Sequence, residues 1–177
     1  MYIETTEKLL DFIEKSPTAF QAVDEMQKRL TENGFEVLSE KEYWKLIPGG
    51  KYLVTRNNSA LIAFCIPEKE SRVFHIMASH SDSPSFKIKE NPEMEAAHCI
   101  KLNVEKYGGM LMAPWFDRPL SVAGRVIIRR NGGLKEKLIN IKRDLVMIPN
   151  LAIHMNREAN NGVAYNPQKD LLPLFAA

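Results

Sequence analysis

The sequence has little that would direct it to a membrane or to an export pathway. Its apolar run ending at Ile66 is far shorter than the ~20 residues that a membrane-spanning helix needs. Glu4, Glu7 and Asp11 interrupt the N-terminal region, where a signal peptide would be continuously apolar. We therefore expect no membrane partner and predict a cytoplasmic protein.

Cysteine is scarce and the charges nearly balance. Cys65 and Cys99 stand far apart in unlike contexts, which favours reduced thiols over a disulfide framework or a thiolate metal site. The 24 basic and 22 acidic residues give a formal net charge of +2, so no nucleic-acid partner is expected. With 177 residues, 45% of them hydrophobic, the chain can form one sizeable core, or one small domain and part of another.

Two helical patterns are present near the N-terminus. Leu9 and Ile13 lie on one face of a first helix. Ser16-Pro17 then predicts a boundary, because serine can cap a second helix and proline can open it. The second helix keeps apolar residues at helical spacing and is predicted to end at Asn33-Gly34.

Short strands are expected after the helices. Residues 51–55, 59–66 and 72–79 are rich in β-branched and aromatic side chains, and turn-forming residues separate them. The two helices should pack on the sheet that these strands form. This first part of the chain is therefore predicted to be α/β.

A hairpin is expected in the second half. Residues 122–130 and 134–141 flank Asn131-Gly132-Gly133, which tolerate the positive φ that a tight turn requires. Basic side chains are frequent between residues 125 and 143. They fit a solvated β face; the alternative is an electrostatic field that attracts acidic substrates.

The composition changes beyond Pro84, and no long helix is expected there. We place a domain boundary near residue 88. The predicted organisation is an α/β segment, two helices plus strands, over residues 1–88 and a mainly β domain over residues 89–177.

The segment His80-Ser81-Asp82 carries the clearest chemical signal. His80 follows a predicted strand and would emerge at its carboxyl end, where open α/β sheets bind ligands. Imidazole is a good zinc ligand, and Asp82 can accept the other ring N–H and so orient the ring. The alternative is a loop histidine followed by turn-forming residues, and the tripeptide alone favours that alternative.

Seven short strings spread over the whole chain share the order and spacing of one known family. They are Ser16-Pro17-Thr18-Ala19-Phe20, Lys51-Tyr52-Leu53-Val54-Thr55-Arg56-Asn57, Ser79-His80-Ser81-Asp82-Ser83-Pro84, Tyr107-Gly108-Gly109, Trp115-Phe116-Asp117-Arg118, Ala123-Gly124-Arg125 and Ile148-Pro149-Asn150-Leu151-Ala152-Ile153-His154. Together they resemble the aspartyl aminopeptidase family of zinc metallopeptidases. The resemblance implies an exopeptidase that removes aspartate or glutamate from peptide N-termini. It also implies a catalytic domain interrupted by a β-rich dimerisation domain, through which the protein self-associates.

The resemblance assigns roles to three residues. It implies that His80 is a ligand to one of two zinc ions per site, and that Asp82 is the active-site carboxylate that orients it. His154 matches a histidine that, in the family, reaches into the active site of a neighbouring subunit and helps to hold the substrate. Without the resemblance, His154 is interpreted as a strand histidine bonded to a backbone carbonyl.

Other polar residues are expected to be structural. His75 is predicted to be packed or hydrogen-bonded within its strand, and His98 matches no motif. Trp115 is predicted to be an aromatic anchor, and Asp117 and Arg118 are predicted to form a local ion pair.

The resemblance also implies what this chain lacks. Family members are much longer, and their bridging aspartate, catalytic glutamate, other carboxylate ligands and a late histidine would follow Ala177. The chain is therefore expected to be a truncated part of the aminopeptidase, inactive alone. The alternatives are a non-catalytic dimerisation or interaction module derived from that family, and a β-rich binding domain with a coincidental H-x-D. Retention of His80 and Asp82 favours the enzyme.

Overall fold

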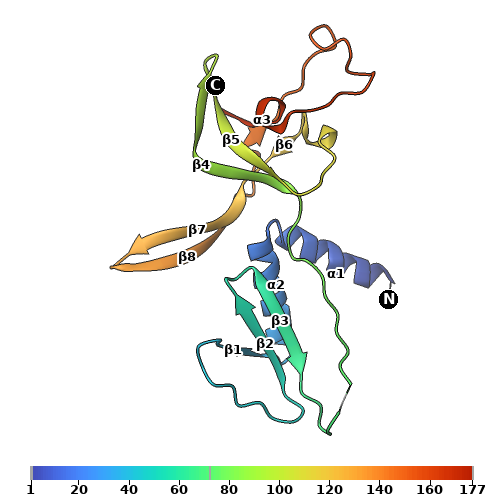
Figure 1. The fold of residues 1–177 in the computed structure, drawn as a ribbon, viewed down its shortest axis with the longest axis vertical. Coiled ribbons are helices and arrows are strands. Elements are labelled where there is room, and N and C mark those ends of the chain that lie inside the picture. Colours follow the sequence, from blue (N-terminus) through green and yellow to red (C-terminus); the bar gives the residue numbers. More distant parts are fainter. Residues whose placement is uncertain (1, 72, 177) are drawn as a thin grey trace. The chain divides into compact units, whose positions relative to one another are not determined.

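The computed structural model describes residues 2–71 and 73–176, which form two compact units (Figure 1). The first unit comprises Met1–Asp82 and Ala123–Asn140, and the second comprises Ser83–Val122 and Ile141–Ala177. The chain thus leaves the first unit after Asp82 and returns to it for one hairpin. That the catalytic segment and the dimerisation domain divide near residue 88 stays a prediction.

Two helices open the first unit, α1 (Tyr2–Lys15) and α2 (Ala19–Glu32). Ser16-Pro17 does not begin α2 as predicted. Thr18 is the N-cap residue, and its backbone oxygen accepts the first helical hydrogen bond from Ala22 N at 2.9 Å. The prediction of two N-terminal helices is confirmed, and the cap was misplaced.

A three-stranded sheet follows, formed by β1 (Glu36–Leu38), β2 (Lys51–Arg56) and β3 (Ala60–Cys65) in the order β1-β2-β3. β1 runs parallel to β2, and β2 runs antiparallel to β3. Asn57 and Asn58 connect β2 to β3 at φ +53° and +50°, values that asparagine tolerates better than most residues. The first two predicted strands are confirmed, whereas β1 is too short to give a sequence pattern.

The middle of α2 packs against this sheet. Gln21, Ala22 and Val23 are its buried residues, and α2 contacts both β2 and β3 (Figure 1). On the sheet side, Leu53 is fully buried. α2 ends at its predicted stop, where Gly34 adopts φ +84°, a left-handed conformation that costs glycine little.

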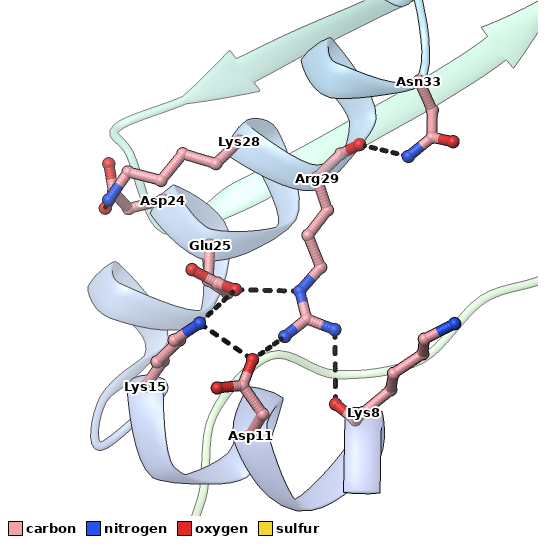
Figure 2. Close-up of polar contacts among 8 residues, drawn as sticks. All are labelled: Lys8, Asp11, Lys15, Asp24, Glu25, Lys28, Arg29 and Asn33. Carbon is pink, nitrogen blue, oxygen red and sulfur yellow. Dashed lines mark hydrogen bonds and ion pairs between the residues drawn. The ribbon is translucent and has the colours of Figure 1, made fainter. Parts of the chain in front are cut away.

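Charged side chains join α1 to α2 (Figure 2). Lys15 Nζ lies 2.8 Å from Asp11 Oδ2 and 3.9 Å from Glu25 Oε1. Arg29 binds the same two carboxylates, at 2.8 Å each, and also donates to the backbone oxygen of Lys8. Because α1 has no buried residue, no buried apolar side chain holds it. These ion pairs and hydrogen bonds therefore help to attach α1 to α2.

The hairpin predicted in the second half is confirmed. β7 (Ala123–Arg130) pairs antiparallel with β8 (Gly133–Asn140). Asn131 and Gly132 form the turn at φ +51° and +74°, as a tight hairpin turn requires.

The second unit is mainly β, as predicted. Its five-stranded sheet has the order β4-β5-β10-β9-β6. The strands are β4 (Ser85–Ala96), β5 (Cys99–Tyr107), β6 (Pro119–Leu120), β9 (Val146–Met147) and β10 (Leu174–Ala176), accompanied by the short helices η1 (Ala113–Trp115) and α3 (Pro167–Asp170).

Leu102, Val104 and Val146 form a buried cluster in the core of this second unit. Phe86 packs against that core and meets the ring of Trp115 edge-on, with centroids 5.0 Å apart. Trp115 is thus the aromatic anchor that the sequence predicted. Among residues 2–71 and 73–176, none of the helices has the length and apolar character needed to cross a membrane.

Candidate functional site

The segment that leads to His80 is not the strand that the sequence predicts. Residues 73–79 belong to no helix or strand, and residue 72 lies outside the described residues. The side chains of Phe74 and Met77 are 85% and 99% exposed, and His75 is exposed rather than packed. The β-branched and aromatic composition is typical of a strand, but a strand also needs a neighbouring backbone edge, which composition does not supply.

His80 and Asp82 do meet, as the H-x-D spacing predicts. Nδ1 of His80 lies 2.9 Å from Oδ1 of Asp82 and 2.9 Å from its backbone oxygen. Both are acceptors, so the hydrogen-bond pattern assigns the proton to Nδ1 and leaves the Nε2 lone pair for another ligand. The His80 side chain is 82% exposed, and this nitrogen is therefore accessible.

Ser81 ties the motif to the sheet of the first unit. Its Oγ donates a hydrogen bond of 2.9 Å to the backbone oxygen of Ser59, immediately before β3. The residue between the histidine and the aspartate is thereby held at the β2–β3 turn. The motif is positioned by this side-chain contact rather than by membership of the sheet.

The described residues supply one ligand that fits a zinc site, but not a complete set of zinc ligands. A catalytic zinc usually has about three protein ligands. Across residues 2–71 and 73–176, no three histidine, cysteine, aspartate or glutamate side chains gather closely enough to hold a metal ion. His80, oriented by Asp82, is the donor that matches zinc chemistry.

His154 belongs to the second unit and lies in a turn, not in a strand. The backbone oxygen of Ala152 accepts from Met155 N at 2.8 Å and from Asn156 N at 3.2 Å. His154 is exposed within this turn. The interpretation of His154 as a strand histidine was therefore wrong.

Asp117 has a role that the sequence did not predict. Its Oδ1 accepts a hydrogen bond of 2.9 Å from the backbone N–H of Asn150. The predicted pairing with Arg118 is not among the ion pairs of the described residues; Arg118 instead donates to the backbone oxygen of Pro114. The two partners, Asp117 and Asn150, are 33 positions apart, so no local spacing could have indicated the contact.

Arg125 is structural rather than part of a solvated basic face. Its side chain is 16% exposed, its guanidinium lies 4.2 Å from the centroid of Phe20, and Nη1 donates to the backbone oxygen of Asn57 at 2.9 Å and to Glu136 at 3.2 Å. The exposed basic residues of the two strands are Arg129, Arg130, Lys135 and Lys137.

His98 occupies the turn between β4 and β5, with φ +66°. It is exposed, and its neighbour Cys99 has a free thiol, as does Cys65. The prediction of free cysteines is thus confirmed.

The family comparison covers nearly the whole chain. The family described as aminopeptidase I zinc metalloprotease (M18) matches residues 12–177. The probable M18 family aminopeptidase 2 of Clostridium acetobutylicum is 50% identical over 178 aligned residues, which cover 98% of this chain and 41% of the relative. The chain therefore spans less than half the length of this curated relative.

Solved structures share the fold. A chain of the Ape4 and Nbr1 complex superposes with a TM-score of 0.91 at 40% identity, covering 96% of this chain and 33% of that one. The S. cerevisiae mApe1 dodecamer gives a TM-score of 0.79 at 25% identity, covering 98% of this chain and 38% of that one. The fold of this chain thus matches the corresponding part of these proteins.

Proposed function

This chain belongs to the aminopeptidase I zinc metalloprotease (M18) family, and we propose that it is the N-terminal segment of a zinc aminopeptidase to whose active site it contributes His80. The observation that carries the proposal is the contact between His80 Nδ1 and Asp82 Oδ1 at 2.9 Å. It supports a ligand role because it frees Nε2 and strengthens that nitrogen as a donor.

The residues of this chain have separate tasks in the proposed enzyme. His80 binds metal through Nε2, and Asp82 holds the ring in the tautomer that makes this possible. Zinc bound at such a site would polarise the scissile carbonyl and lower the pKa of a bound water. A site with two zinc ions also requires carboxylate ligands. These would come from the part of the relatives' sequence that this chain does not cover.

The proposed substrates are peptides with an N-terminal aspartate or glutamate. This specificity comes from the resemblance to aspartyl aminopeptidases. In the proposed assembly, the exposed imidazole of His154 enters the active site of a neighbouring subunit and helps to hold the substrate. Self-association is supported by the dodecamer of a structural relative, and we propose residues 89–177 as its surface because the family resemblance implies a dimerisation domain there. A cytoplasmic location remains a prediction from the sequence.

We further propose that the 177-residue chain alone has no aminopeptidase activity. A single neutral imidazole does not offset the cost of desolvating a divalent ion, so zinc should bind weakly and exchange readily. The test is calorimetric zinc titration of this chain and of its His80→Ala variant, together with an assay on an aspartyl or glutamyl peptide. Stoichiometric tight binding that is lost in His80→Ala, accompanied by turnover, would contradict the proposed inactivity.

A second candidate is a non-catalytic dimerisation or interaction module of the same family. Both candidates are consistent with the absence of a three-ligand group among the described residues. The coding sequence beyond residue 177 separates the candidates. An open frame that encodes aspartate and glutamate ligands supports the enzyme, whereas a stop codon supports the module.

A further inference from the structure

We propose that Asp117 is a positioning residue that sets the path of the loop carrying His154. Two of its atoms hold one short segment of the second unit. Its backbone N–H donates to the carbonyl oxygen of Ile148 at 2.9 Å, and its Oδ1 accepts from the N–H of Asn150 at 2.9 Å. Asp117 therefore binds the chain on both sides of Pro149.

The segment bonded to Asp117 begins at a buried residue. Ile148 is fully buried and forms a parallel β-bridge with Phe116, the residue that precedes Asp117. The ring of Phe116 in turn packs on Tyr165, with centroids 5.0 Å apart. The position of Asp117 is thus set by the core of the second unit, and the carboxylate transmits that position to Asn150.

The backbone conformation of Asp117 limits which residues can replace it. Its φ is +54°, a left-handed value that glycine, asparagine and aspartate adopt most readily. Only aspartate and asparagine among these also carry a side-chain oxygen that can accept from the N–H of Asn150. Both properties are needed for the observed pair of contacts.

Hydrogen bonds, not apolar packing, determine the path from Asn150 to His154. The apolar side chains of this loop are 57% exposed at Leu151, 47% at Ile153 and 76% at Met155, so burial constrains them little. Asn150 Oδ1 accepts from Leu151 N at 2.9 Å, and the next residue, Ala152, is the backbone acceptor of the turn that holds His154. Asp117 is the residue that links this series of local hydrogen bonds to the core.

The functional value of this positioning rests on the proposed role of His154 in a neighbouring active site. A loop that must present an imidazole across a subunit boundary needs a defined direction, because catalytic groups act only within a narrow range of geometries. Asp117 would supply that direction without contacting substrate.

The test compares three substitutions in this chain by NMR. Asp117→Asn keeps the left-handed preference and the acceptor, Asp117→Gly keeps only the conformation, and Asp117→Ala keeps neither. Asp144→Ala removes an exposed carboxylate from the same unit as a control. The readouts are amide exchange at Asn150 and the ring resonances of His154. The amide of Leu102, bonded to Pro173 O at 2.8 Å, reports whether the core remains folded.

We expect exchange at Asn150, relative to Leu102, to accelerate about ten- to a hundredfold in Asp117→Gly and Asp117→Ala. The His154 resonances should shift in these two variants, and Asp117→Asn should restore both readouts. The proposal is overturned if Asp117→Gly leaves exchange at Asn150 unchanged, or if Asp117→Asn behaves like Asp117→Ala. These readouts need no activity, so they can confirm the positioning even if His154 proves to have no role in a neighbouring site.

Discussion

Gln21 in α2 donates a hydrogen bond from Nε2 to the backbone oxygen of Ile139 in β8 at 2.8 Å. The same nitrogen lies 3.3 Å from the backbone oxygen of Gly124 in β7. One buried amide, 7% exposed, therefore binds both strands of the hairpin to the helix. This contact helps to explain why residues 123–140 belong to the first unit although they are far along the chain.

Gln21→Ala should loosen the hairpin. It leaves two backbone oxygens without the Gln21 donor, at a cost of about 1–3 kcal/mol. Amide exchange across β7 and β8 should accelerate accordingly. Gln27→Ala, on the same helix but only partly buried, should change it little; equal effects of the two substitutions would show that Gln21 has no special role.

Arg125→Lys should also weaken this attachment. The guanidinium stacks on Phe20 and reaches Asn57 and Glu136 together, and an ammonium cannot keep that planar geometry. We expect a loss of about 1–2 kcal/mol in hairpin protection. Arg129→Lys, at an exposed position of the same strand, is the matched control, and a comparable loss there would contradict the interpretation.

Acid should weaken the contact between α1 and α2. The hydrogen bond from Lys15 lowers the pKa of Asp11, the charges of Lys15 and Arg29 act in the same direction, and burial opposes them. Because the pKa of Asp11 is lowered in the folded state, its ionised carboxylate stabilises the fold above the ordinary aspartate pKa of about 3.9. This stabilisation is lost as pH falls through the lower pKa of the folded state.

NMR shifts of the α1 amides should therefore change below the ordinary pKa of aspartate. In Asp11→Asn, this acid-induced change in the α1 amide shifts should be absent. Asp24→Asn, which removes only the pair with Lys28 inside α2, should leave the α1 transition intact. An α1 transition that survives in Asp11→Asn would point to another group.

The sequence predicted those parts of the fold that local signals determine. Helix α2 has its stop at Asn33-Gly34, and the hairpin has Asn131-Gly132 at its turn, so a few neighbouring residues decide each structure. The described part of the strand predicted at residues 72–79, residues 73–79, does not form a strand, because strand formation depends on a partner edge elsewhere. The three residues of β1 are too few to show periodicity, and their place is fixed by pairing with β2.

In the candidate site too, local contacts could be predicted from the sequence and long-range contacts could not. His80 and Asp82 are two positions apart, so their spacing indicated a possible contact, and the family resemblance favoured it over a plain loop histidine; the structure shows the contact. The expectation that His80 ends a strand failed with the strand itself. The link from Asp117 to Asn150 spans two segments that only the fold brings together, and no periodicity or spacing could have predicted it.

Asp82→Ala should weaken zinc binding in a full-length enzyme. Removing the carboxylate that fixes the ligand tautomer typically lowers metal affinity about 10–100-fold. Zinc competition against a chelator measures this directly. Asp144→Ala is the control, and unchanged affinity in Asp82→Ala would show that the backbone oxygen of Asp82, also 2.9 Å from Nδ1, is sufficient to orient His80.

Mixing two inactive full-length variants should restore activity if His80 acts within its own subunit and His154 acts in the neighbouring one. A mixed dimer of His80→Ala and His154→Ala contains one site with both histidines intact and one with neither. With random assembly, half of the dimers are mixed, so about one quarter of the sites should work. Aminopeptidase assays after dissociation and reassembly measure the recovery. Each inactive variant dissociated and reassembled alone is the control. Verified mixed dimers without any recovered turnover would mean that His154 is structural, or that it acts in its own subunit.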